Sequence, residues 1–346
     1  MINVYQTIKK YIFVFLFSGV FIIASEANAD NFYSATSTTI ARAKGMGGAY
    51  TAVLDGPAST LYNPAALGLY RFPRKSKMTV FLNPMGLAAI YQDREVLFKQ
   101  REMENKDWGS LSGAFIKTIA FTGPSFAAVL NFAEQLPRFQ PYQKQKYLSS
   151  VNLLDSNFNS LSLRLNLAKQ ISIGASGFLY NVKNFRNTLK EFGSSYGILI
   201  RPAENFTIGV AYFDYPKQIA PLMLAKNRTV DETINVGLSY KPASFVMFAA
   251  DIRNVSEDQS PITREMHFGM ELVPSSLIAF RTGYYQRKDD HRKIYSFGVG
   301  LLDSNVFHST GNGFVFHDFV LNYGLEIEKV MDSIDYRHFM TLLIRL

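Results

Sequence analysis

The chain has 346 residues, a formal net charge of +8 and no Cys, which excludes disulfides, thiolate metal sites and a cysteine nucleophile. Hydrophobic residues make up 47% of it and aromatic residues 14%. Beyond the N-terminal segment, no stretch approaches the roughly 20 apolar residues of a membrane-spanning helix, so only strands could cross a bilayer. The basic residues are scattered. They suit the phosphates of outer-membrane lipid, and we expect no nucleic-acid partner.

Residues 1–29 have the pattern of a secretory signal peptide. Lys9 and Lys10 precede an apolar stretch over 11–24, and small residues at 27–29 form a cleavage site. An uncleaved anchor is disfavoured, because the apolar stretch is shorter than the roughly 20 residues of a spanning helix. We expect export and cleavage after Ala29.

A segment rich in Gly, Ala and Pro follows. It contains Gly-Met-Gly-Gly-Ala-Tyr at 45–50 and Asn-Pro-Ala at 63–65, and such a backbone can thread a narrow space. A phosphate loop is disfavoured because no Gly-Lys-Ser/Thr follows, whereas Asn63-Pro64 also fits a simple turn. We assign residues 30–76 to a plug. Its candidate ligand-pocket residues are Gly45, Met46, Gly47, Gly48, Tyr50, Asn63, Pro64 and Ala65.

Residues 77–346 alternate with the period of two that is typical of strands. Leu161 and Leu163 face one way and Ser160 and Ser162 the other. Short connections alternate with longer ones, as in a membrane barrel with one plain and one decorated rim. We predict fourteen strands, at 78–91, 110–121, 124–132, 158–167, 171–182, 194–201, 206–213, 232–240, 245–253, 265–272, 277–286, 294–302, 315–327 and 336–346. The longer connections are 92–109, 133–157, 183–193, 214–231, 254–264 and 287–293, with 303–314 as a long exception on the plain rim.

The motifs at 45–50 and 63–65 resemble the plug of the FadL family of hydrophobic-compound transporters and their PorV-like relatives. The resemblance implies an all-β protein, a 14-stranded antiparallel transmembrane β-barrel with a small N-terminal plug (hatch) in its lumen. It implies a monomer in the outer membrane of a Gram-negative type of cell. In this family a kinked strand opens the wall, and Gly123 and Pro124 are the candidates for that kink.

The resemblance leaves two functions open. The first is passive uptake of hydrophobic small molecules such as long-chain fatty acids, through the plugged lumen and a lateral opening. The second is a PorV-like platform for protein secretion or surface attachment, without solute transport. For uptake, Arg164 and Arg281 are candidate anchors for a ligand carboxylate; the alternative is that lumen charges brace wall and plug. The charges expected to face the lumen are Arg164, Arg201, Asp251, Arg253, Glu271, Arg281, Arg337 and Arg345.

Enzymatic chemistry has no visible basis in the sequence. The five His residues lack metal-ligand spacing, and no nucleophile and base form a recognisable set, so we expect no catalytic residue, metal or cofactor. The chain instead ends on an apolar strand, with Met340, Leu342, Ile344 and Leu346 on one face. We expect barrel-assembly machinery to recognise that strand.

The precursor should be cut after Ala29, and the mature protein should fractionate with outer membranes as a heat-modifiable monomer. N-terminal sequencing and electrophoresis of unheated samples check this. Full-length protein in the inner membrane or in the soluble periplasm would contradict it.

Overall fold

The computed structural model describes the chain in twelve pieces. Residues 1–39, with the expected signal peptide and the first part of the expected plug, lie outside the described residues. The described residues are 40–67, 76–100, 105–135, 154, 156–184, 187–216, 232–255, 264–275, 278–286, 293–301, 318–330 and 333–346.

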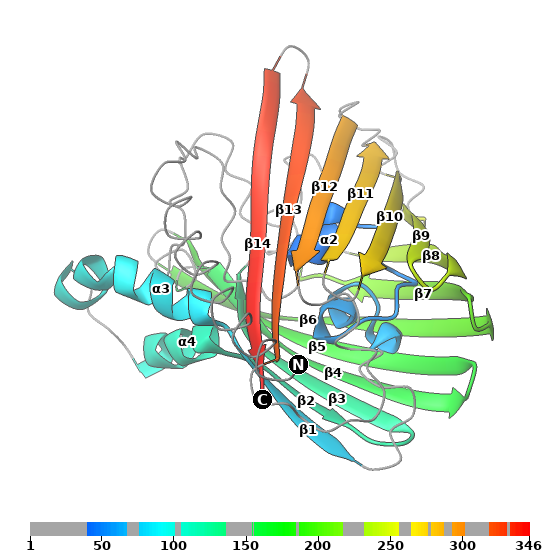
Figure 1. Ribbon diagram of the computed structural model, residues 1–346. Helices are drawn as coiled ribbons and strands as arrows, with labels where there is room; N and C mark the ends of the chain where they lie inside the picture. The colour runs from blue at the N-terminus through cyan, green and yellow to red at the C-terminus, as the bar shows by residue number, and fades with distance from the viewer. Residues whose placement is uncertain are drawn as a thin grey trace, which may run out of the picture.

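Fourteen antiparallel strands follow one another around a closed barrel, and β14 closes on β1 (Figure 1). This confirms the predicted fold class. The strands are β1 (Lys77–Leu82), β2 (Ile116–Thr122), β3 (Phe126–Gln135), β4 (Ser156–Ala168), β5 (Ile171–Asn184), β6 (Asn187–Ala203), β7 (Phe206–Asp214), β8 (Glu232–Ala243), β9 (Val246–Arg253), β10 (Glu265–Ser275), β11 (Ile278–Gln286), β12 (Lys293–Leu301), β13 (Asp318–Val330) and β14 (Ser333–Arg345).

The wall is apolar outside and small or polar inside. On β4, Leu161, Leu163 and Leu165 are exposed, whereas Ser160 and Ser162 are buried. A bilayer accounts for this arrangement, because lipid-facing residues of a transmembrane barrel are apolar and lumen-facing residues polar. In the described part of the chain, no helix is both long and apolar enough to span a membrane.

Two predicted strands are wrong over part of their length. The strand expected at 78–91 ends at Leu82, and helix α3 (Pro84–Gln92) follows it. The Asn83 side chain caps α3 by accepting a hydrogen bond from the backbone of Met85, and Pro84 fits the first helical turn. The strand expected at 110–121 begins only at Ile116, after helix α4 (Asn105–Phe115). A π-helical turn, η3 (Val96–Gln100), lies between the helices.

The loop expected at 183–193 is also wrong. β5 continues to Asn184 and β6 begins at Asn187, and the two strands pair from end to end. The short turns at 169–170, 204–205 and 244–245 join their strands as expected. The connection expected at 303–314 lies outside the described residues.

The segment 40–67 lies inside the barrel (Figure 1). Helix α2 (Ile40–Gly45) contacts β11 to β14, and the short helix η2 (Pro64–Ala66) contacts β4 to β7. A second short helix, η1 (Pro57–Leu61), packs beside η2. The segment therefore crosses the lumen from one wall to the opposite one. We call residues 40–67 the described plug.

The barrel closes on very few strand pairs. β1 pairs with β14 through Phe81 with Arg345 and Leu82 with Ile344, and Val80 exchanges two backbone hydrogen bonds with Leu346 just beyond β14. Among the described residues, the rest of that β14 edge, 333–343, has no strand beside it. β2 likewise pairs with β3 only as far as Asn131, so residues 132–135 extend beyond it. We call the interval between these two edges, above the ends of β1 and β2, the wall notch.

The helices α3 and α4 lie outside the barrel across the wall notch (Figure 1). Met85 and Ala89 of α3 pack against Leu321 and Leu342, on the outer faces of β13 and β14. Ala114 of α4 packs against Ala133 of β3. We call α3, η3 and α4 the helical panel.

Replacing Leu163 by Arg should destabilise the folded barrel by about 2–4 kcal/mol if the side chain sits near the bilayer midplane, because a cation there must leave water. Urea unfolding in lipid vesicles measures the change. Leu163→Phe, which keeps the site apolar, serves as the control and should be nearly neutral. Equal stability of the two variants would contradict a lipid-facing Leu163.

Candidate functional site

The glycine motif lies where the described plug meets the wall, backbone against backbone. Gly47 and Gly48 have φ of +62° and +75°, which favour Gly. A Cβ on Gly47 would lie 2.8 Å from the backbone nitrogen of Tyr284 on β11. From the opposite side, a Cβ on Gly283 would lie 2.1 Å from the backbone nitrogen of Gly47. Side chains at these positions would push the plug off the wall.

Buried charges bind the described plug to β10 and β11. Arg42 donates two hydrogen bonds to Glu271, at 2.9 and 2.7 Å, and a third to Asp55 at 2.6 Å. Arg281 reaches the same Glu271 at 2.7 Å and also donates to Asn322 at 2.8 Å. Two guanidinium groups thus meet two carboxylates, so the cluster is neutral. The Arg42–Glu271 contact is bidentate, a geometry that fixes orientation as well as distance.

The surroundings of Arg42 and Tyr50 raise the pKa values of both side chains. Burial works against the Arg42 cation, but Asp55 and Glu271 outweigh it and raise the pKa of Arg42 above its ordinary value. Burial also raises the pKa of Tyr50, against the opposing effect of Arg42. The Tyr50 hydroxyl therefore stays protonated and donates to Asp55.

A second set of wall side chains binds the plug backbone. Asp251 on β9 accepts hydrogen bonds from the backbone of Tyr50 at 2.8 Å and of Thr51 at 2.9 Å. His267 Nδ1 lies 2.6 Å from the carbonyl oxygen of Gly47, and Arg253 donates to that of Gly48. Because these contacts are made to backbone atoms, they fix the path of the plug backbone and do not depend on the side chains that it carries.

The Asn-Pro-Ala motif occupies the opposite wall. Asn63 donates to the carbonyl of Thr51 at 2.9 Å, and its Oδ1 accepts from the backbone of Ala65 at 2.9 Å, which caps η2. A Cβ on Gly197 of β6 would lie 1.9 Å from Asn63 Oδ1. The carbonyl of Ala65 accepts from Ser172 on β5 at 2.8 Å. The motif is therefore part of a plug–wall contact as well as a turn.

The two proposed carboxylate anchors have different environments. Arg281 is buried between Glu271 and Asn322 and braces the plug contact. Arg164 is half-buried and donates from Nε to Asn166 at 2.9 Å. In the described part of the chain, no carboxylate forms an ion pair with Arg164. Its Nη2 also donates to Asn166, at 2.5 Å, so of the two Arg164 is the one whose partner is a neutral amide and not a carboxylate. The side chains of Arg337 and Arg345 lie outside the described residues.

The wall-kink candidates lie in a turn. Gly123 and Pro124 connect β2 to β3, and the Gly123 backbone donates to the carbonyl of Phe126 at 2.7 Å. No strand is kinked at these two residues. A lateral opening, if the barrel has one, needs another location.

The lumen carries two apolar patches beside the described plug. One lies next to the wall notch, where Leu67 of the plug packs against Phe81 and Leu343. The other faces Leu61 of η1 from β4 and β5 and is aromatic, with Phe158 and Tyr180 centroids 5.5 Å apart. The first patch comprises Leu67, Phe81, Ala120, Ala127, Val129, Val320 and Leu343. The second comprises Phe158, Phe178, Tyr180 and Val182, with Leu61 and Tyr215 against it.

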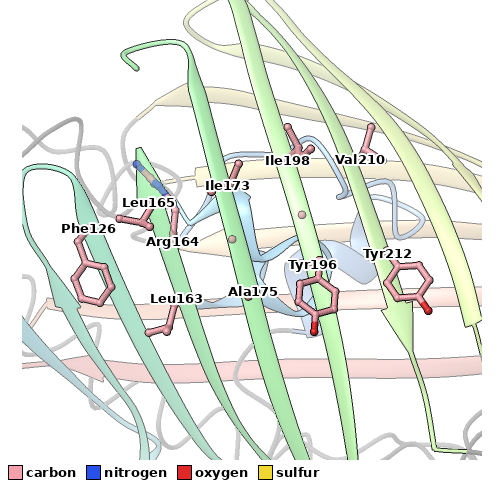
Figure 2. A pocket seen from close by; sticks show the side chains of 12 residues that line it. Phe126, Leu163, Arg164, Leu165, Ile173, Ala175, Tyr196, Ile198, Val210 and Tyr212 are labelled. Carbon is pink, nitrogen blue, oxygen red and sulfur yellow. The ribbon is translucent and has the colours of Figure 1, made fainter. Parts of the chain in front are cut away.

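An apolar groove of about 540 Å³ lies on the outer face, across β3 to β7 (Figure 2). Its lining includes lipid-facing side chains such as Leu163, Tyr196 and Val210, with Arg164 in the same set. β4 to β7 are fully paired beneath it, so the groove does not lead into the lumen. Lipid chains are its expected contents.

Sequence reasoning missed Arg42, Asp55 and Asn83. The first two are charges that, with Lys44, interrupt a segment rich in Gly and Ala, and a charge in such a segment was the available signal. Asn83-Pro84 is a helix-start pattern of the kind that Asn63-Pro64 also shows. Within the described residues, no cluster of three or more His, Asp or Glu side chains could hold a metal ion.

No family model and no curated protein matches the chain. Solved structures similar to it include a FadL homologue from Pseudomonas aeruginosa, with 12% identity, coverage of 89% of this chain and 96% of that one, and a TM-score of 0.42. A deletion mutant of the monoaromatic hydrocarbon channel TodX has 11% identity, 88% and 96% coverage and a TM-score of 0.46. The Pseudomonas putida toluene transporter TodX has 12% identity, 88% and 95% coverage and a TM-score of 0.43.

At these identities and TM-scores the similarities assign no function, and the inferences below rest on the barrel's own residues. The closed antiparallel wall with an apolar exterior is the architecture of an outer-membrane protein. The lumen of this barrel is crossed by a plug that its own buried charges hold in place.

Replacing Glu271 by Gln should loosen the described plug, because two buried guanidinium groups would then share one carboxylate. Breaking such a buried pair costs about 3–5 kcal/mol. In planar bilayers we expect the variant to show opening events that the wild type lacks, and deletion of 40–67 to show steady conductance. Glu95→Gln, at an exposed carboxylate, is the control. A Glu271→Gln barrel that folds and stays silent would contradict this role.

Proposed function

We propose that this barrel is a passive outer-membrane channel for hydrophobic compounds, with long-chain fatty acids as the first class to test. Its signal peptide would be removed during export. The observation that carries the proposal is the position of the apolar lumen patch around Leu67, Phe81 and Leu343, where β1 meets β14 at the border of the wall notch. A lipid-like solute needs an apolar lining beside a part of the wall where strand pairing is missing. An ion needs neither of these features.

The described plug supports this assignment over a diffusion porin. It crosses the bore and is fixed by buried ion pairs, so a continuous water path would require their rupture. An apolar molecule has a different option, because it is soluble in the membrane itself. It could enter at the decorated rim, contact the aromatic patch near Phe158, and leave sideways without passing the plug.

The wall notch is the exit that the strand pairing favours. Elsewhere a lateral opening would have to break a continuous ladder of backbone hydrogen bonds, at a cost of several kcal/mol for each group left unsatisfied in hydrocarbon. Between β14 and α3 the contact consists of side chains, with Met85 and Ala89 against Leu321 and Leu342. Such a contact can part and re-form without breaking a ladder between two strands.

Arg164 is the anchor that we retain for a ligand carboxylate. Its guanidinium could bind an acid headgroup, and a bidentate contact through Nε and Nη2 would take the place of Asn166. A neutral hydrocarbon would not need this contact, so Arg164→Ala separates the two kinds of substrate. Uptake of oleate should fall several-fold in Arg164→Ala if an acid headgroup is bound there. Unchanged uptake would remove the anchor and leave the channel.

A pair of Cys residues introduced at Ala89 and Leu342 should place transport under the control of a crosslink across the wall notch. The chain has no Cys of its own, so only the introduced pair can react. Oleate uptake is measured in a host that lacks its own transporter. A disulfide or a short thiol crosslinker should abolish uptake by the pair, and reduction should restore it. The control pair, at Phe206 and Tyr240, bridges two strands that already pair, so crosslinking it should have no effect.

Uptake that persists in the crosslinked Ala89–Leu342 variant would exclude the wall notch as the exit. A well-folded wild type that supports no uptake, and that co-purifies with exported proteins, would exclude transport and favour the secretion or attachment platform.

A further inference from the structure

We propose that the helical panel is seated in the lipid bilayer as part of the barrel wall, with Leu87, Tyr91, Phe98 and Trp108 against lipid. The partner is membrane lipid: acyl chains along α3 and the headgroup boundary at its outer end. The inference concerns the place of the panel and does not depend on whether a solute passes.

The first support is the length of the strands beneath the panel. β1 has six residues and β2 has seven, whereas a strand needs about 9–11 residues to cross the hydrocarbon. The neighbouring strands are longer: β14 has thirteen residues and β3 has ten. The wall at β1 and β2 therefore ends partway across the membrane, and the panel begins where these strands stop. A helix can take their place in lipid because it satisfies its own backbone hydrogen bonds.

The second support is continuity with the lipid-facing surface. One side of α3 covers Leu321 and Leu342, which point out of the barrel. Its other side presents Leu87, 49% exposed, and Tyr91, 68% exposed, and α3 has no charged residue. α3 therefore packs on the lipid-facing side of the wall and exposes an apolar side of its own. Both surfaces are then in contact with the same lipid.

The third support is the way the panel packs. A Cβ on Gly86 of α3 would lie 2.1 Å from the carbonyl oxygen of Ala114 on α4. A Cβ on Gly113 would lie 2.9 Å from the Cβ of Phe132 on β3. Close approach through small residues is typical of helices that associate within a membrane, where burial of apolar surface supplies little attraction.

The charges mark where the panel leaves the hydrocarbon. They begin directly after α3, at Asp93, and Glu95 and Lys99 form an exposed ion pair at 3.5 Å. Arg94 lies over the ring of Tyr91, 4.4 Å from its centroid. Near this boundary Trp108 and Phe98 are half exposed and stacked, with centroids 5.8 Å apart. Aromatic residues gather at the membrane interface in this way because one part of the ring is apolar and another polar.

The test uses intrinsic fluorescence, because Trp108 is the only Trp in the chain. The full-length protein is reconstituted into vesicles of phosphatidylcholine whose acyl chains are brominated near the headgroup or near the chain end. We expect blue-shifted emission and a strong loss of emission in brominated lipid, greatest for bromine near the headgroup. Iodide in the water should quench it weakly.

Two matched variants calibrate the result. Trp108→Phe with Phe268→Trp places the reporter on the lipid-facing side of β10, and Trp108→Phe with Lys169→Trp places it in an exposed turn. Quenching of the native Trp108 that resembles the Phe268 reporter supports the proposal. Strong iodide quenching like that of the Lys169 reporter would overturn it in favour of water. Protection from both quenchers would overturn it in favour of a protein cover.

Discussion

The structure depends on one constraint: within hydrocarbon, each backbone N–H and C=O group must find its partner in the protein. Ten of the fourteen strands, β4 to β13, meet this constraint with long ladders to both neighbours, whereas the edges of β14 and β3 that face the wall notch have no strand beside them in the described part of the chain. β1 and β2 are too short to do so over the full height of the wall. The chain resolves the shortfall with helices, which carry their hydrogen bonds internally, and packs them by side chains onto β14 and β3. The wall notch is the geometric consequence.

The described plug poses a different problem from the wall, because specific contacts must fix its position inside a polar bore. Buried ion pairs add little net stability when desolvation offsets their attraction. Their geometry, however, selects one position, since Glu271 must receive Arg42 and Arg281 together. Wall glycines such as Gly283 allow the plug backbone to approach closely. We infer that charge fixes the place of the plug and that the glycines make the space for it.

We propose that these two features divide the barrel into a closed bore and a wall with one seam. The plug would block the polar route, and its residue Leu67 contributes to the apolar patch beside the notch. A barrel built for ions would place polar side chains there and leave the bore open. The distribution of apolar surface, rather than any single residue, is what favours a hydrophobic cargo.

Much of the barrel could be predicted from the sequence. Period-two alternation located β4, β5 and β7 to β12 closely, because each of these strands has lipid on one side and the polar lumen on the other, but it placed the start of β6 at 194 instead of 187. The same reasoning failed at 78–91. Met85, Leu87, Ala89 and Tyr91 are apolar at every second position, a spacing that fits a strand as well as a helix with lipid around it. The Asn83-Pro84 start was the local signal against a strand. The plug motif indicated a close backbone contact, but Asp251, which binds Tyr50, and Glu271, which binds Arg42, lie some 200 residues away and could not be paired with the plug from spacing.

The most direct test of the helical panel uses spin labels on α3. A label is placed at each position from 84 to 92, one at a time, and its collision rate with oxygen is measured in lipid vesicles. In a helix, Met85 and Ala89 share one face and Leu87 and Tyr91 the other. The account predicts low oxygen accessibility at Met85 and Ala89 and high accessibility at Leu87 and Tyr91. In a strand all four positions would share one face, so equal accessibility at all four would contradict the helical panel and the wall notch with it.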